Sequence, residues 1–337
     1  MQVLKLGRLA LPAVAAMILA LGLLAAPATA QDASGTDPTA QAVGEQQLFE
    51  ELNKIQGRIT IPDAQAATLV QPQGRDFRAF HESALPWIGG LVILGMLVVI
   101  AVFFFYRGRI RTQAPEANVR IQRFNALERL AHWLTATAFI VLAITGLNFI
   151  FGKRLLMPLI GADGFASWSQ WALYAHDFFS WAFMLGVLVM LVVWIRDNLP
   201  DRYDVNWLKQ GGGMFDKSNS THPPAGRFNT GQKLIFWSVV LGGIALSVTG
   251  LVLLMPFAFT DVNGMQLAQT IHAIVGVVMI AVIIAHIYIG TLGMEGAFEA
   301  MGSGTVDLNW AKEHHSAWVE KKGDAGAPPR QAATPAE

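Results

Sequence analysis

The chain has 337 residues, of which 53% are hydrophobic and 14% charged, and its 24 basic and 24 acidic residues leave no net charge. This composition, with a mean hydropathy of +0.42, is typical of an integral membrane protein and gives no support to nucleic-acid binding. The chain has no cysteine, which excludes disulfides, c-type haem attachment and thiolate-bound iron–sulfur clusters within it.

The first 30 residues have the order of parts found in a secretory signal peptide. Lys5 and Arg8 precede an apolar run, and the sequence Ala-Thr-Ala at residues 28–30 has the small-residue spacing of a cleavage site. We therefore expect a signal peptide at residues 1–30, cleaved after Ala30. The alternative is an uncleaved anchor helix, because the run is nearly long enough to span a bilayer. Residues 31–84 then form a polar periplasmic segment.

Five apolar segments follow, each with at least about the 20 residues that a helix needs to cross a bilayer. They lie at residues 85–106, 131–151, 171–195, 234–257 and 267–292. Lysine and arginine, which favour the cytoplasmic side, are concentrated in the loop at residues 107–130, in the loop after the third segment and in the tail at residues 293–337. We therefore expect a multi-pass protein of the bacterial inner membrane, with its mature N-terminus in the periplasm and its C-terminus in the cytoplasm.

An internal repeat indicates how these segments are organised. The sequence Ala-Ile-Thr-Gly-Leu at residues 143–147 precedes a segment with His176, and Ser-Val-Thr-Gly-Leu at residues 247–251 precedes one with His272. We interpret the repeat as a duplicated helix pair. The predicted fold is an all-α membrane protein, with a four-helix transmembrane bundle at residues 131–292 and one extra N-terminal transmembrane helix. The repeated glycines would admit either a bulky planar group or a close neighbouring helix.

Four histidines, His132, His176, His272 and His286, lie inside or at the ends of the apolar segments, where ionisable side chains are costly and usually functional. His272 and His286 are 14 residues apart, which places them on one helix face about 21 Å apart along the axis. The predicted crossing directions put His176 at the depth of His272, on the outer side. They put His132 at the depth of His286, on the inner side.

Matching depths predict two noncovalent haem b groups with bis-histidine ligation of the iron, one between His176 and His272 and one between His132 and His286. The four-helix bundle would then be haem-binding. A structural metal and a proton relay are alternatives, although zinc ligands cluster at one point and a relay needs no matching in pairs. Arg123 would be suited to neutralise haem propionates, as would Arg129, or both would only follow the positive-inside rule.

The remaining histidines carry weaker signals. His81 and His222 are most simply solvated, and His314 and His315 suggest only a surface contact. The exported segment and the tail would either dock partner subunits or stay solvated.

Four features between residues 120 and 320 point to one known family. They are Arg-Leu-Ala-His-Trp at residues 129–133, His176 at the start of the next segment, the spacing of His272 and His286, and Trp-Ala-Lys-Glu-His-His at residues 310–315. In these the chain resembles the gamma subunit of membrane-bound formate dehydrogenases, a di-haem cytochrome b. The last feature looks specific to that family. The histidine core is shared with the cytochrome b subunits of nickel–iron hydrogenases and related proteins.

The resemblance implies a subunit that carries electrons from a periplasmic iron–sulfur beta subunit through two haems to menaquinone or ubiquinone at the cytoplasmic side. Formate would be oxidised on a molybdenum- or tungsten-containing alpha subunit, so this chain would hold no catalytic residue. The family's Asn-x-Gly-Gln-Lys segment is matched at residues 229–233. The resemblance therefore implies that Asn229 and Gly231 contact the quinone beside His286. From the residues alone, this segment is a polar helix start with an asparagine cap.

Two other functions remain open. A hydrogenase cytochrome b would share the electron path but not the donor, and the tail motif and N-terminal extension argue against it. A transporter or non-redox anchor would have no haem, and transporters commonly place polar sites at the membrane midplane rather than in two layers.

Overall fold

The computed structural model describes residues 74–218 and 222–326. The predicted signal peptide, and residues 31–73 of the predicted periplasmic segment, lie outside the described residues. The contacts divide the chain into two units, Met1–Phe80 and His81–Glu337. Of the first unit, only α4 (Gly74–Ala79) and Phe80 are described. Apart from Phe80 itself, all the residues whose structure is described from here on belong to the second.

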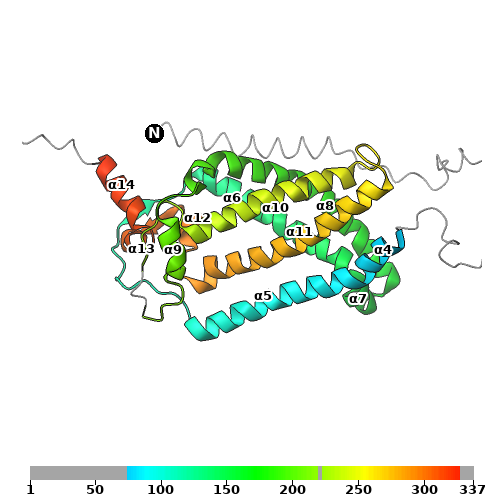
Figure 1. The fold of residues 1–337 in the computed structure, drawn as a ribbon, viewed down its shortest axis with the longest axis horizontal. Helices are drawn as coiled ribbons and strands as arrows, with labels where there is room; N and C mark the ends of the chain where they lie inside the picture. Colours follow the sequence, from blue (N-terminus) through cyan, green and yellow to red (C-terminus); the bar gives the residue numbers. More distant parts are fainter. Residues whose placement is uncertain (1–73, 219–221, 327–337) are drawn as a thin grey trace, which may run out of the picture. The chain divides into compact units, whose positions relative to one another are not determined.

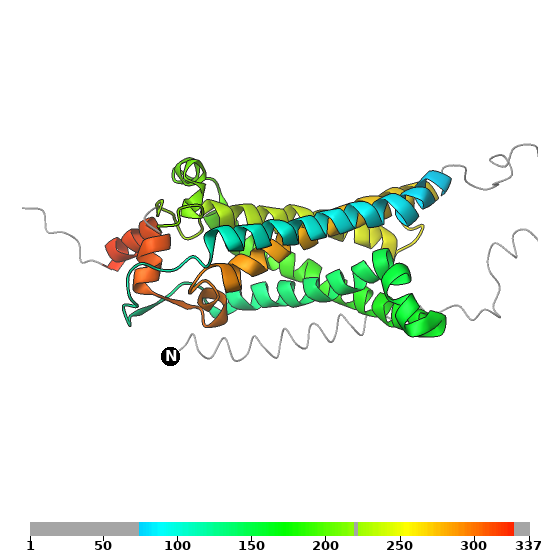
Figure 2. The ribbon, with the colours of Figure 1, turned by 90° about the horizontal axis from the view of Figure 1, so that it is seen from below.

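Five helices of the described chain belong to segments long and apolar enough to cross a membrane. They are α5 (Leu85–Arg107), α6 (Ala126–Leu147), α8 (Met157–Trp194), α10 (Thr230–Leu254) and α11 (Val262–Tyr288). They run side by side in Figures 1 and 2. Large apolar side chains on α5, such as Trp87, Leu91 and Phe105, are exposed, which suits contact with lipid rather than water. The second unit is therefore that of a helical integral membrane protein.

Short elements connect these helices. They are π-helical turns at Phe80–Ala84, Asn148–Gly152 and Ile289–Gly293, 3-10 turns at Arg196–Asn198 and Gly211–Gly213, and the helices α7 (Lys153–Leu155), α9 (Asp204–Lys209), α12 (Glu299–Gly302), α13 (Leu308–His314) and α14 (Ser316–Gly326). Two strands, β1 (Arg120–Gln122) and β2 (Thr305–Asp307), pair antiparallel with Ile121 opposite Val306. This small sheet departs from the purely helical prediction, because strands of three residues leave no periodic signal.

Each of the last four long helices begins before the predicted apolar segment. Asn125 caps α6, because its side chain accepts from the Glu128 amide while the Glu128 carboxylate accepts from the Asn125 amide. Asn229 caps α10 with Gln232 in the same way, and Asp261 caps α11. Hydropathy detects only the apolar part of a helix, whereas the cap decides where the helix begins. The difference is largest for α8, which begins at Met157 although its apolar segment was predicted from residue 171. This helix has a kink at Gly161, where φ is 76°.

Close packing joins the helices through small residues. A side chain at Gly186 of α8 would lie 3.1 Å from the Thr135 backbone of α6, and one at Gly243 of α10 would lie 2.9 Å from Val187 of α8. Helix α5 packs mainly on α11, where Gly89 leaves room for Val277. Small residues let helix backbones approach, which is the usual way helices associate in a membrane. The division into a four-helix bundle and one added helix, α5, stays a prediction.

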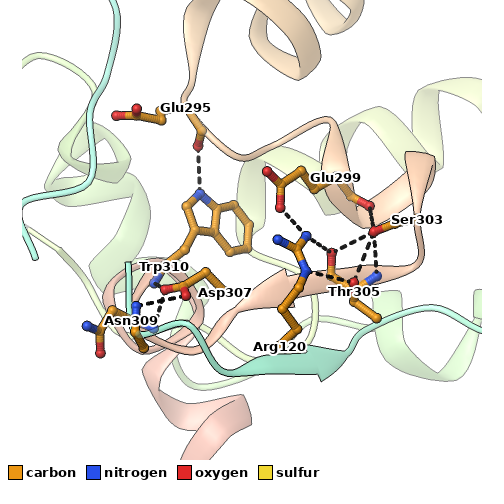
Figure 3. A network of polar contacts seen from close by, with 9 residues as sticks. Arg120, Glu295, Glu299, Ser303, Thr305, Asp307, Asn309 and Trp310 are labelled. Atoms are coloured by element: carbon orange, nitrogen blue, oxygen red, sulfur yellow. Dashed lines mark hydrogen bonds and ion pairs between the residues drawn. The ribbon is translucent and has the colours of Figure 1, made fainter. Parts of the chain in front are cut away.

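The elements after α11 fold onto one end of the long helices, called here the tail end (Figure 1). Arg120 of β1 pairs with Glu299 and donates to Thr305, while the indole of Trp310 donates to the Glu295 carbonyl at 2.7 Å (Figure 3). Asp307 caps α13. Strand β1 and the segment that follows α11 are thereby tied together.

The tail buries residues for which the sequence predicted only a surface contact. Trp310 is 5% exposed and His315 is 1% exposed, and Nδ1 of His315 donates to the Gly226 carbonyl at 2.8 Å. His222, which was expected to be solvated, lies with its Nε2 3.1 Å from the Glu313 carboxylate. Both expectations were wrong, because the burial comes from loops that are distant in the sequence.

Candidate functional site

The four intramembrane histidines meet in two pairs. The ring centroids of His132 and His286 are 6.2 Å apart, and those of His176 and His272 are also 6.2 Å apart. Helix α11 contributes one histidine to each pair, with the other from α6 at one level and from α8 at the other. The two levels are separated by 14 residues of α11, about 21 Å of helix.

The separation within each pair suits one atom between two rings. Metal–imidazole bonds are about 2.0 to 2.1 Å and a ring centroid lies roughly 1.1 Å behind its nitrogen, so two rings on opposite sides of one metal have centroids about 6.3 Å apart. Both observed separations are close to that value. The residues present therefore fit a metal-centred group such as the expected haem at each level. Their role as axial ligands stays a prediction.

At the level of His176 and His272, which is predicted to be the outer one, the repeated threonine–glycine pair contacts the histidine of the following helix. Oγ1 of Thr145 lies 2.7 Å from Nδ1 of His176, and Oγ1 of Thr249 lies 2.9 Å from Nδ1 of His272. A side chain at Gly146 would lie 3.6 Å from Cε1 of His176, and one at Gly250 would lie 3.4 Å from Cε1 of His272. The internal repeat thus places the same two residue types around each outer histidine.

The level of His132 and His286, which is predicted to be the inner one, has a different environment. Nδ1 of His132 is buried and has no hydrogen-bond partner among the described residues. The ring centroids of His132 and Trp133 are 5.1 Å apart, with the two rings nearly perpendicular. The Trp133 indole donates to the Met301 carbonyl at 3.0 Å. Trp133 therefore connects this level to the tail end of the molecule.

The predicted quinone contacts at the start of α10 have structural partners. The Asn229 side chain accepts from the Gln232 amide at 2.9 Å, and a side chain at Gly231 would lie 3.0 Å from the Trp207 ring. A shallow hollow of about 130 Å³, partly open to solvent, lies beside them and is lined by Asn229 and Trp207 among others. No water-sized sphere fits inside it, whereas ordinary ligand pockets have roughly 300 to 1,000 Å³. The cap expected from the residues is present, and the quinone contact stays a prediction.

The two arginines considered for haem propionates differ in their surroundings. Arg129 donates to the Met301 carbonyl at 3.0 Å, to the Ser303 carbonyl at 3.2 Å and to the Gly302 carbonyl. Arg123 is 3% exposed, and its Nε and Nη1 have no partner among the described residues. Burial, and then the charge of Arg227, lower the pKa of Arg123 to about 9. Of the two, Arg123 is the one that an anion would stabilise.

Sequence analysis missed two buried ionic clusters near these residues. Glu128, 2% exposed, accepts from the Trp194 indole at 2.9 Å and from Arg227 at 2.6 Å. Lys233, 5% exposed, contacts carboxylate oxygens of Asp201 and Asp204 at 2.9 Å. Charged residues at the ends of membrane helices look like orientation signals in a sequence, and the sequence holds no sign that distant loops enclose them.

Comparisons with known proteins agree with one another. A family model described as prokaryotic cytochrome b561 matches residues 123–304, a range that holds all four histidines and Asn229. The chain is 33% identical to the cytochrome b556(Fdo) subunit of formate dehydrogenase from Escherichia coli (strain K12), over 60% of this chain and 92% of that protein.

Two further relatives carry similar names. The chain is 29% identical to the cytochrome b556(Fdn) subunit of the nitrate-inducible formate dehydrogenase of the same strain, over 60% of this chain and 91% of that protein. It is 24% identical to a formate dehydrogenase cytochrome b556 subunit of Haemophilus influenzae, over 61% of this chain and 84% of that protein. Helix α5 lies outside the range that the family model matches.

Proposed function

The chain belongs to the prokaryotic cytochrome b561 family, and from this premise we propose that it is the cytochrome b subunit of a respiratory formate dehydrogenase. A cytochrome of this class holds haem b. The named relatives are all cytochrome subunits of formate dehydrogenases, which favours this function over that of a hydrogenase cytochrome b. The equal 6.2 Å separations of the two histidine pairs carry the proposal that there are two haems.

His176 and His272 would hold the outer haem, and His132 and His286 the inner one. Haem at each level would supply one-electron transfer, so the two levels together would conduct electrons across the membrane. The chain's own residues hold the rings in place: Thr145 and Thr249 contact the outer histidines. Arg123, whose Nε and Nη1 have no partner among the described residues, would bind a propionate of the inner haem.

The distribution of basic residues supports an orientation in the bacterial inner membrane. Residues 1–30 would be a cleaved signal peptide and residues 31–84 a periplasmic segment, followed by the extra helix at 85–106. The haem-binding core would be residues 131–292. The loop at 107–130, which precedes it in the sequence, and the tail at 293–337, which follows it, would both be cytoplasmic. Strand β1 of that loop pairs with strand β2 of that tail, so the described parts of both regions lie at the same end, as that orientation requires.

The partners follow from the same proposal. An iron–sulfur beta subunit would deliver electrons at the outer level, having received them from a molybdenum- or tungsten-containing alpha subunit that oxidises formate. Menaquinone or ubiquinone would accept them near Asn229 and Gly231. Moving an electron inward against a negative-inside potential costs about 2.3 kcal/mol per 100 mV, which the quinone couple must supply.

The first experiment measures haem in the purified, membrane-inserted chain. A reduced-minus-oxidised spectrum with haemochrome quantitation should give two b haems, and His272→Ala and His132→Ala should each lose a different one. His222→Ala is the matched control and should keep both, because its ring lies beside Glu313 and not at either level. A folded chain without haem would contradict the proposal and favour a non-redox anchor or transporter.

A second experiment separates the two redox donors. Membranes that contain the whole complex should reduce quinone with formate and not with hydrogen. Hydrogen-dependent reduction without a response to formate would instead support the hydrogenase cytochrome b.

A further inference from the structure

Each of the two outer histidines contacts a threonine hydroxyl, and the two threonines belong to the sequence repeat. Thr145 and Thr249 occupy the same position in the two copies of the repeat, and each hydroxyl lies within 2.9 Å of Nδ1 of the histidine on the next helix. Thr145 is 4% exposed and Thr249 is 9% exposed, so water does not compete freely for either hydroxyl. Both copies of the repeat keep the contact, which indicates a requirement of the site rather than an accident of packing.

The direction of each hydrogen bond follows from the number of hydrogens. A threonine hydroxyl has one hydrogen to donate, and both hydroxyls have a backbone carbonyl four residues earlier to receive it. Thr145 donates to the Val141 carbonyl at 2.8 Å, and Thr249 donates to the Ala245 carbonyl at 2.7 Å. Each oxygen must then accept from the histidine, so Nδ1 carries the proton. The lone pair of His176 and of His272 is left on Nε2.

The glycine of each pair completes the arrangement. Gly146 and Gly250 lie beside Cε1 of the same rings, where a Cβ would come to 3.6 and 3.4 Å, an ordinary van der Waals contact. Each ring therefore has a threonine hydroxyl at Nδ1 and a glycine beside Cε1. His132 at the inner level has no such partner among the described residues.

We propose that Thr145 and Thr249 are positioning residues that fix the tautomer of His176 and His272 and lower the reduction potential of the outer haem. The inference rests on the proposed function. A ring that donates from Nδ1 is a more basic ligand at Nε2, and a more basic ligand stabilises oxidised iron. A lower potential at the outer level makes electron transfer toward the inner level more favourable, against the opposing membrane potential.

The test is a potentiometric titration of the two b haems in the purified chain. The outer haem is identified as the one that His272→Ala loses. Thr145→Val and Thr249→Val keep the side-chain shape but remove the hydroxyl, so each should raise the midpoint of the outer haem and leave the inner one unchanged. The double variant should raise it further. The low-spin electron paramagnetic resonance signal of the outer haem should shift as well.

Two controls separate this effect from a packing defect. Thr270→Val removes a hydroxyl on α11 that donates to the Gln266 carbonyl at 2.9 Å, and should leave both midpoints unchanged. Thr145→Ser and Thr249→Ser keep the hydroxyl and should titrate like the unmodified chain. If a valine variant loses the outer haem while the serine variant keeps it, the positioning role is supported.

Three results would overturn the inference. They are valine variants that bind two haems with unchanged midpoints, equal shifts at both haems, and loss of the outer haem in the serine variants as well. The first leaves the proposed function intact. An unmodified chain without haem would overturn the proposed function itself.

Discussion

Asn229 shows how one residue acquires a structural and a functional assignment. Its side chain caps α10 by accepting from the Gln232 amide, and the Gln232 side chain accepts in return from the Asn229 amide and from Arg123. The cap accounts for an asparagine at this position without any quinone. The resemblance to formate dehydrogenase gamma subunits adds the quinone role. A substitution that keeps the helix cap but removes the side-chain amide distinguishes the capping role from the quinone role.

Asn229→Ser is that substitution, because serine caps helices about as well as asparagine. We expect unchanged haem content and thermal stability, with quinone reduction slowed by up to about tenfold if one hydrogen bond to the quinone is lost. Steady-state reduction of a soluble quinone analogue by the complex is the measurement. Asn229→Ala loses the cap as well and should also be less stable by about 1 kcal/mol. Full quinone activity in Asn229→Ser would leave Asn229 a cap alone.

At the scale of the helices, α8 and α6, which carry His176 and His132, approach each other closely at one glycine. Gly186 faces Thr135 so closely that a Cβ would lie 3.1 Å from the Thr135 backbone, and the buried Glu128–Trp194 hydrogen bond joins the same two helices at the tail end. Backbone cannot move aside as a side chain does, so a methyl group at this point must push the helices apart.

We therefore expect Gly186→Ala to destabilise the chain by about 1 to 3 kcal/mol and to weaken haem retention. Thermal unfolding followed by absorbance at the Soret band measures both the stability of the chain and its retention of haem. Gly95→Ala on α5 is the matched control, since nothing lies within 4 Å of its Cβ, and it should be neutral. An equal loss of stability in both variants would contradict the packing argument.

At the scale of the whole described second unit, the tail closes the end of the bundle with two neutral histidines. His315 donates to the Gly226 carbonyl, and burial, followed by the charge of Arg123, holds its pKa well below the usual range. Burial, then His222 and Arg123, lower the pKa of His314 to about 4. A tail that comes free regains the ordinary histidine pKa of about 6.5 and binds protons that the docked tail cannot.

Docking of the tail should therefore be full above about pH 6.5 and weaken as the pH falls from 6.5 toward 4. His314 alone would cost about 2 kcal/mol at pH 5. Hydrogen exchange over residues 308–323, corrected for the intrinsic pH dependence of exchange, should show lost protection at pH 5 relative to pH 7.5. His314→Gln should reduce that difference. Equal protection at the two pH values would show that the histidines do not govern docking.

Sequence patterns predicted what is local in the chain. Apolar runs predicted the five segments that are long enough to cross a membrane, and the spacing of His272 and His286 on α11 follows from the pitch of one helix. The resemblance to the formate dehydrogenase family is confirmed by the comparisons. Ligation of haem by the four histidines stays a prediction.

Tertiary structure alone decided the contacts between distant residues. Thr145 meets His176 from 31 residues away, and Arg123 lies against Arg227 from 104 residues away. The sequence therefore determined the class of protein, the apolar segments and the family, because hydropathy, helical period and motifs are properties of neighbouring residues. Which hydroxyl holds which histidine, where β1 pairs and what the tail buries depend on helix packing, because burial arises only where separate segments come together.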